Sequence, residues 1–172
     1  VYKRQPPCRY DPARIAIAAV VLFLSLPWIA ANLGVYLPDV GFITERPITG
    51  SDGAVKPAVH HGNHHGFDGA LILISALLLS RPTLRSPALR SVTTAYVSLM
   101  AAYGAINAAQ DFWNEQVQKR DWSDWNFPKA IEPALTPIWL VILAASVAIF
   151  VLLDREPGDR NSGAEPRRRA HS

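Results

Sequence analysis

The stretch IAIAAVVLFLSLPWIAANLGVYL, residues 15–37, decides the fold that the sequence predicts. As a helix it is long enough to cross a hydrocarbon core of ~30 Å, because each helical residue adds ~1.5 Å. Pro27 is expected to kink this helix, since proline removes one backbone hydrogen bond. An alternative interpretation is a secretory signal peptide, because basic residues precede the apolar run and the small residues Ala30 and Ala31 lie within it.

Three further segments have the same character and lie at residues 60–80, 91–112 and 135–153. The first of these is unusual, because its apolar part covers only residues 69–79 and a spanning helix needs about 20 residues. A full helix would therefore begin near His60, and the alternative is a short or re-entrant segment preceded by a histidine-rich loop. The sequence thus predicts an all-α integral membrane protein, a four-helix transmembrane bundle.

The distribution of Lys and Arg predicts the orientation of this bundle, because cytoplasmic loops carry the excess of positive charge. Twelve basic residues fall in the amino-terminal segment 1–14, in the loop between the second and third helices, and in the tail 154–172. Only five fall in the outer loops 38–59 and 113–134. We therefore expect a transmembrane domain over residues 15–153 with both termini in the cytoplasm. The polar, Arg-rich tail is expected to be disordered.

Composition and the placement of charge argue against nucleic-acid binding and against an internal disulfide. The chain of 172 residues is 49% hydrophobic, and its apolar residues are segregated into long blocks, as membrane proteins require. Its pI of about 9.2 does not indicate nucleic-acid binding, because the basic residues cluster beside the apolar blocks and form no single face. The single cysteine, Cys8, excludes an internal disulfide.

Four of the five histidines lie in the run HHGNHHGFD, residues 60–68. In a helix, residues three or four apart share a face, so these histidines form two pairs with a carboxylate one turn beyond. Imidazole nitrogens suit transition metals, and a carboxylate completes or orients such a ligand set. The alternatives are an exposed histidine-rich loop and histidines that hydrogen-bond other helices or sense pH. The candidate metal ligands are His60, His61, His64, His65 and Asp68.

A stripe of mostly polar residues follows one face of the third segment, at alternating steps of three and four. Its polar amides would be costly against lipid, so the stripe is expected to face the bundle interior or a water-filled cavity. The alternative is ordinary hydrogen bonding between helices. The stripe consists of Thr93, Tyr96, Met100, Tyr103, Asn107, Gln110 and Asn114, with Asp111 at its edge.

The topology predicts one polar pocket at the non-cytoplasmic side, because the second segment begins there and the third ends there. Asp111 is the candidate catalytic base of this pocket. Asn107 and Gln110 are candidate binding residues that would orient a cofactor, substrate or water. The expected pocket walls are His61, His65, Asp68, Asn107, Gln110 and Asp111.

Two functions follow from these features. The first is a membrane protein that binds zinc or copper, with iron as a further candidate, and acts as a metal-dependent oxidoreductase or a metal handler. The second is a non-catalytic accessory or assembly subunit of a larger membrane complex. The expected location is the plasma membrane. The expected partners are the lipid bilayer and either further copies of this chain or other membrane subunits, without nucleic acid.

Overall fold

The computed structural model describes residues 8–35, 37–38, 43–59, 65–81, 84, 86–131 and 135–154. Over this part of the chain the fold is mainly helical, with one short hairpin. Its elements, in chain order, are α1 (Asp11–Leu24), α2 (Leu26–Leu33), β1 (Pro47–Thr49), β2 (Val55–Pro57), α3 (His65–Leu79), α4 (Pro87–Gln116), the 3₁₀ helix η1 (Gln118–Arg120) and α5 (Ile138–Asp154).

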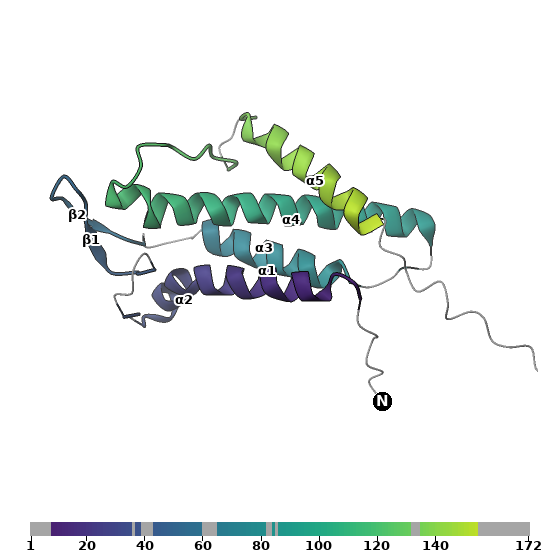
Figure 1. The fold of residues 1–172 in the computed structure, drawn as a ribbon, viewed down its shortest axis with the longest axis horizontal. Coiled ribbons are helices and arrows are strands. Elements are labelled where there is room, and N and C mark those ends of the chain that lie inside the picture. Colours follow the sequence, from purple (N-terminus) through teal and green to yellow (C-terminus); the bar gives the residue numbers. More distant parts are fainter. Residues whose placement is uncertain are drawn as a thin grey trace, which may run out of the picture.

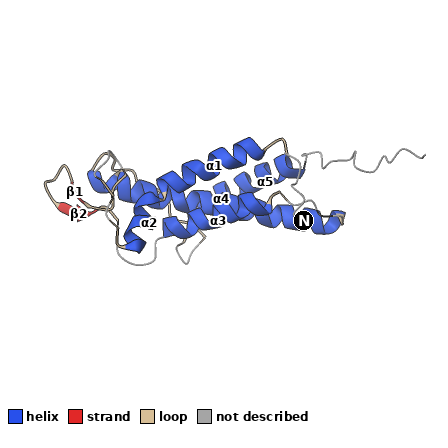
Figure 2. Ribbon diagram, turned by 90° about the horizontal axis from the view of Figure 1, so that it is seen from below, coloured by secondary structure: helices blue, strands red, loops and turns tan. Residues whose placement is uncertain are grey.

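The long helix α4 is the centre of the arrangement. Helix α3 packs along one side of α4 and α5 along the other, while α1 lies against α3 (Figure 1). The antiparallel pair β1–β2 lies beyond one end of the helices, next to η1, and it keeps this position in the view turned by 90° (Figure 2). The end of α4 that is nearest the hairpin is therefore surrounded by loops and by α2.

Local sequence signals explain where several helices begin and end. Ser86 caps α4, because its side chain accepts a hydrogen bond from the Leu89 amide and Pro87 follows at the first helical position. Gly34 ends α2 with a φ of 67°, a left-handed conformation that glycine adopts without strain. Pro27 lies in the first turn of α2, and the chain bends by 50° between α1 and α2. The kink expected at Pro27 is found as a bend at Ser25, where α1 ends and α2 begins.

Two glycines allow α3 and α4 to approach very closely. A Cβ atom on Gly69 would lie 2.8 Å from the Gly104 carbonyl oxygen, and one on Gly104 would lie 2.6 Å from the Gly69 carbonyl oxygen. The backbones are thus in contact at this crossing. Small apolar cores lie on either side of α4, one with α3 around Leu73 and Val97, the other with α5 around Ile138 and Ile142.

The expected membrane architecture is not found. Among the described residues, no single helix is both long and apolar enough to cross a bilayer, and the bent pair of α1 and α2 meets that test only when its two helices are joined. The prediction of a four-helix transmembrane bundle with both termini in the cytoplasm is therefore wrong. The observed fold is a helical bundle around α4 with a hairpin at one end.

The physical reasons differ between the segments. Helix α3 begins at His65 and has 15 residues, which gives it a length of roughly 22 Å at ~1.5 Å per residue. Helix α4 is long enough, but it extends from Pro87 to Gln116 and carries ionisable groups at both of its ends. The first apolar segment contains two helices rather than one, because the chain bends after α1.

Many apolar side chains of this bundle face outward. Among the described residues, twenty-five large apolar side chains are exposed, whereas fifteen hydrophobic residues form the core. Large exposed apolar patches are unusual for a protein that works alone in water. We call the exposed apolar side chains of the four long helices the apolar belt: Ile15, Ile17, Val20, Leu22 and Phe23 of α1; Leu71, Leu78 and Leu79 of α3; Leu89, Val92, Tyr96 and Leu99 of α4; and Leu140, Val141, Leu143, Val147 and Leu152 of α5.

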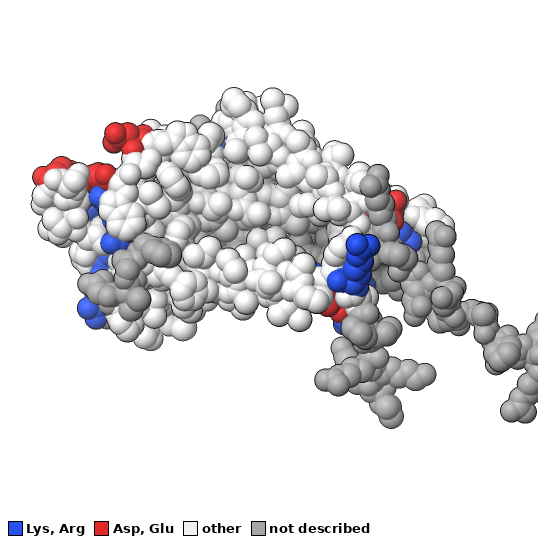
Figure 3. Space-filling view, in the orientation of Figure 1, with Lys and Arg blue, Asp and Glu red and all other residues white. Residues whose placement is uncertain are grey.

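Charged side chains lie at the two ends of the belt. Figure 3 shows Lys, Arg, Asp and Glu gathered at both ends of the face in view, with an uncharged surface between them. At one end Arg81 pairs with Asp11 at 2.9 Å, and at the other Lys56 pairs with Asp121 at 3.2 Å. The belt therefore has a polar boundary at each end.

Candidate functional site

The last turns of α4 carry a group of buried polar side chains. Asn107, Gln110, Asp111, Glu115 and Gln116 are each exposed by 7% or less. Burial of the first two agrees with the expectation that the polar stripe faces the interior. The stripe does not hold along the whole helix, because Tyr96 is 61% exposed.

Asp111 joins α4 to the first turn of α3. Its Oδ2 atom accepts a hydrogen bond from the backbone N–H of Gly66 at 2.8 Å. The first turn of a helix has backbone N–H groups without partners inside the helix, and a carboxylate there is favourable. A Cβ atom on Gly66 would lie 2.7 Å from the Asp111 Cβ atom, so glycine is needed for this approach. Asp111 therefore holds α3 in place through the carboxylate that was expected to act as a base.

The neighbouring polar groups of α4 bind other segments in the same way. The indole Nε1 of Trp28 in α2 donates to Glu115 Oε2 at 2.6 Å. Gln116 Nε2 donates to the Thr44 carbonyl at 2.8 Å, so the loop before β1 is also fixed. Sequence reasoning did not single out Glu115 and Gln116, because the third segment was expected to end at residue 112. The signal that could have identified Glu115 is its spacing of four residues from Asp111, which continues the buried face by one turn.

A cavity of about 440 Å³ lies between α3 and α4. This cavity brings together three of the residues expected in the polar pocket, His65, Asp68 and Asn107. Gln110 and Asp111, which were also expected there, do not line the cavity. Asn107 Nδ2 donates to the carbonyl of Tyr103 at 2.9 Å, one turn back in its own helix. Its Oδ1 atom is buried and has no hydrogen-bond partner among the described residues. The other lining residues are Gly69, Leu71, Ile72, Tyr103 and Ile131.

The expected metal-ligand set is not assembled in the described part of the chain. Within the described ranges, no group of three or more His, Cys, Asp or Glu side chains is placed to hold a metal ion. The description of the protein as metal-binding is corrected on this ground. His65 and Asp68 lie one turn apart at the start of α3. His60, His61 and His64 lie outside the described residues.

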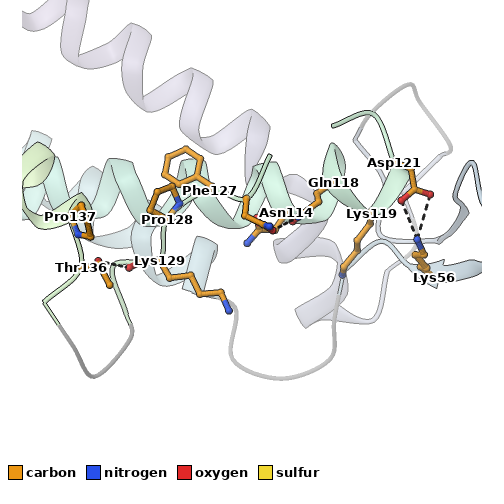
Figure 4. A pocket seen from close by; sticks show the side chains of 11 residues that line it. Lys56, Asn114, Gln118, Lys119, Asp121, Phe127, Pro128, Lys129, Thr136 and Pro137 are labelled. Atoms are coloured by element: carbon orange, nitrogen blue, oxygen red, sulfur yellow. Dashed lines mark hydrogen bonds and ion pairs between the residues drawn. The ribbon is translucent and has the colours of Figure 1, made fainter. Parts of the chain in front are cut away.

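A second cavity, of about 810 Å³, opens where α4, η1 and the loop before α5 meet (Figure 4). Lys56 lines it and is paired with Asp121 and Asp52, each at 3.2 Å. The hydrogen bond between the Lys56 and Asp121 side chains is the main reason that the pKa of Lys56 is raised and the pKa of Asp121 is lowered. This pairing fastens the hairpin to the residue that follows η1.

Lys119 also lines this cavity, but its surroundings differ from those of Lys56. Its Nζ atom donates to the Ala58 carbonyl at 3.1 Å. Burial lowers the pKa of Lys119, and the nearby carboxylates of Glu115 and Asp111 partly oppose this shift. Lys119 therefore serves as a further tie between η1 and the loop that follows the hairpin.

Comparison with known proteins gives no match: no family model, no curated protein and no solved structure matches this chain.

Proposed function

We propose that this chain is a non-catalytic subunit that assembles with apolar helices of a partner protein through its apolar belt. The observation that supports this most directly is the excess of exposed over buried apolar side chains. Burying a large apolar side chain stabilises a complex by roughly 1.5–3 kcal/mol, so a belt of this extent provides a strong driving force for association.

Small residues on α5 favour a helix as the group that covers the belt. Ala144 and Ala148 are both exposed and lie one turn apart on this helix. By helical spacing they form a strip of small side chains between the bulkier exposed side chains of Val141 and Val147. A ridge of side chains on a second helix packs into such a strip at an interaxial distance of roughly 8–10 Å. The strip therefore suits a helix of a partner protein.

The buried polar groups of α4 support a structural rather than a catalytic role. Asp111, Glu115 and Gln116 are engaged in hydrogen bonds that fix α3, α2 and the loop before β1. Of the two functions expected from the sequence, the accessory subunit agrees with this use of the side chains. A metal-dependent activity would need ligands that the described residues do not bring together.

Site-specific photo-crosslinking in the native host tests the proposal. A benzophenone amino acid placed at Val141, within the belt on α5, should give one protein adduct of defined mass. The matched control position is Asp124, an exposed residue outside the belt, where no such adduct is expected. Adding Ala148→Trp, which fills the strip, should abolish the adduct formed from Val141.

Each other outcome of this experiment has a distinct meaning. An adduct with the mass of two chains would replace a different partner by a second copy of this chain. Adducts with lipid alone would contradict a partner helix and favour the lipid contact and plasma-membrane location expected from the sequence. Equal adducts from Val141 and Asp124 would contradict the belt as a specific surface.

A further inference from the structure

The cavity of about 810 Å³ beside η1 has an excess of cationic side chains in its lining. Among its described lining residues there is one carboxylate, that of Asp121, and there are three lysines: Lys56, Lys119 and Lys129. Lys56 is paired with Asp121 (Figure 4) and also with Asp52. The excess positive charge of the lining therefore belongs to Lys119 and Lys129.

These two lysines keep N–H groups that could bind an anion. Lys119 uses one N–H for the Ala58 carbonyl, whereas an ammonium group has three. Burial lowers the pKa of Lys119, and the carboxylates of Glu115 and Asp111 offset this only in part, so a further anion nearby would favour its charged form. The side chain of Lys129 is exposed and has no ion-pair or hydrogen-bond partner among the described residues.

Amide side chains add uncharged groups to the same lining. In the view of Figure 4, Asn114 lies between Lys119 and Lys129. Asn126 accepts a hydrogen bond from Gln118 Nε2 through its Oδ1 atom, and its Nδ2 group has no partner in the part of the chain that is described. A phosphate or carboxylate group carries several acceptor oxygens, so it matches a lining that is rich in free donors.

The loop that carries Lys129 is fixed by contacts within the protein. Thr136 Oγ1 donates to the Lys129 carbonyl at 2.8 Å, and Phe127 packs against the core shared by α4 and α5, with its ring centroid 5.2 Å from that of Trp125. A loop that is already ordered loses less conformational entropy when a ligand binds. Phe127 and Pro128 also give the cavity an apolar wall, and its volume is within the range of small-molecule sites.

We propose that this cavity binds a small organic anion. Its phosphate or carboxylate group lies between the ammonium groups of Lys119 and Lys129 and accepts a hydrogen bond from Asn126, while its apolar part covers Phe127 and Pro128. None of the lining residues belongs to the apolar belt, so the site is independent of the assembly proposed above. Binding would join η1 to the loop before α5.

Calorimetric titration of the full chain with four small probes tests this proposal. Phenyl phosphate and benzoate each carry an anionic group and a ring, phenol carries the ring without the charge, and inorganic phosphate carries the charge without the ring. A chloride concentration of about 0.15 M screens unspecific attraction between exposed charges. We expect saturable binding of at least one of the two aromatic anions, with a Kd on the order of 1 mM. Phenol and inorganic phosphate should bind at least about threefold more weakly than that anion, because each lacks one of the two interactions.

The two aromatic anions distinguish the possible sources of the negative charge. Tighter binding of phenyl phosphate would identify a phosphate monoester as the ligand class, and tighter binding of benzoate would identify a carboxylate. Both results support the site, because Lys119 and Lys129 pair with either group.

Two matched variants locate the binding. Lys129→Gln should weaken binding of the preferred anion by about threefold or more, as expected for loss of an exposed counter-charge. Arg9→Gln removes the same charge from an exposed position two residues before Asp11, at the other end of the bundle, and should leave binding unchanged. Lys119→Gln should weaken binding as well. Because it also removes the contact with Ala58, it is used only if thermal unfolding remains cooperative, and Lys129 decides the test otherwise.

Three results would overturn the proposal. The first is the absence of saturable heat with both aromatic anions. The second is an affinity for phenol or for inorganic phosphate that equals the affinity for the preferred anion, since the charge or the apolar wall would then have no role. The third is an equal effect of Lys129→Gln and Arg9→Gln, which would show a general charge effect rather than a site.

Discussion

The indole of Trp28 in α2 and the carboxylate of Glu115 in α4 form a buried hydrogen bond of 2.6 Å across eighty-seven positions of the chain. Both side chains are only 2% exposed. This bond fixes α2 after its bend away from α1 and closes the end of the bundle that lies next to the hairpin. It is one of several contacts through which the last turns of α4 organise the segments around them.

Replacing Trp28 by Phe should lower the free energy of unfolding by about 2 kcal/mol, because it leaves a buried Glu115 oxygen without its donor, which costs ~1–3 kcal/mol. Chemical denaturation of the purified chain measures this difference. The matched control is Trp122→Phe, at a position that is 61% exposed, where a change within about 0.5 kcal/mol is expected. Equal losses in both variants would contradict the structural importance of the Trp28–Glu115 bond.

Replacing Gly69 by Ala should destabilise the chain by roughly 1–3 kcal/mol, the usual effect of overpacking. The new methyl group would lie 2.7 Å from the Ala108 amide nitrogen and 2.8 Å from the Gly104 carbonyl oxygen, both backbone atoms of α4. Ser75→Thr is the control, since it adds one methyl group to an exposed position of the same helix. Thermal unfolding compares the two, and an unchanged midpoint for Gly69→Ala would argue against the close crossing of α3 and α4.

Replacing Asp111 by Asn should increase hydrogen exchange at the Gly66 amide. The amide side chain still offers an acceptor, but it loses the charge that favours this bond at a helix N-terminus, an effect of about 1 kcal/mol. Hydrogen exchange resolved by residue or by short peptide measures protection in the first turn of α3. Asp124→Asn should leave that protection unchanged, and increased exchange in both variants would point to a general loss of stability instead.

The ion pair between Lys56 and Asp121 makes stability depend on pH at the acidic end. Because the pKa of Asp121 is lowered from 3.8, its stabilising contribution is complete above that value. The contribution is lost as the pH falls through the lower pKa of the folded state. Because the pKa of Lys56 is raised from 10.5, this lysine stays charged throughout the acidic range and up to 10.5.

The test of this ion pair compares thermal midpoints of the wild type and Asp121→Asn across the acidic range. Asparagine suits the exchange, because it tolerates the left-handed conformation with φ of 57° at this position. The wild type should be more stable at neutral pH, and the difference should disappear in strong acid. A difference that is the same at every pH, as expected for the control Asp124→Asn, would contradict the ion pair.

The positions of the helices could be predicted from the sequence better than their lengths and surroundings. Apolar runs indicated α1, α3 and α5, and Pro27 indicated the interruption before α2. An apolar window does not reveal whether its residues belong to one helix or to two, which is why residues 15–37 were read as a single span. It also does not reveal which apolar side chains face the protein and which remain exposed.

The candidate site was predictable only in part. Helical spacing correctly placed Asn107 and Gln110 on a buried face, because polar groups that recur every three or four residues share one side of a helix. Spacing could not show that Asp111 would bond to a backbone amide, since that contact depends on how closely Gly66 approaches α4. The contact between Trp28 and Glu115 is also long-range, and a single sequence carries no local signal for it.

The most direct test of the central claim is the native mass of the assembly extracted gently from its host. The account predicts that the 18.9 kDa chain is found in a complex of fixed composition with another protein. It also predicts that the double substitution Ala144→Trp and Ala148→Trp releases the chain as a folded monomer. A chain that is found alone, or whose complex is unchanged by these substitutions, would contradict the assembly role of the apolar belt.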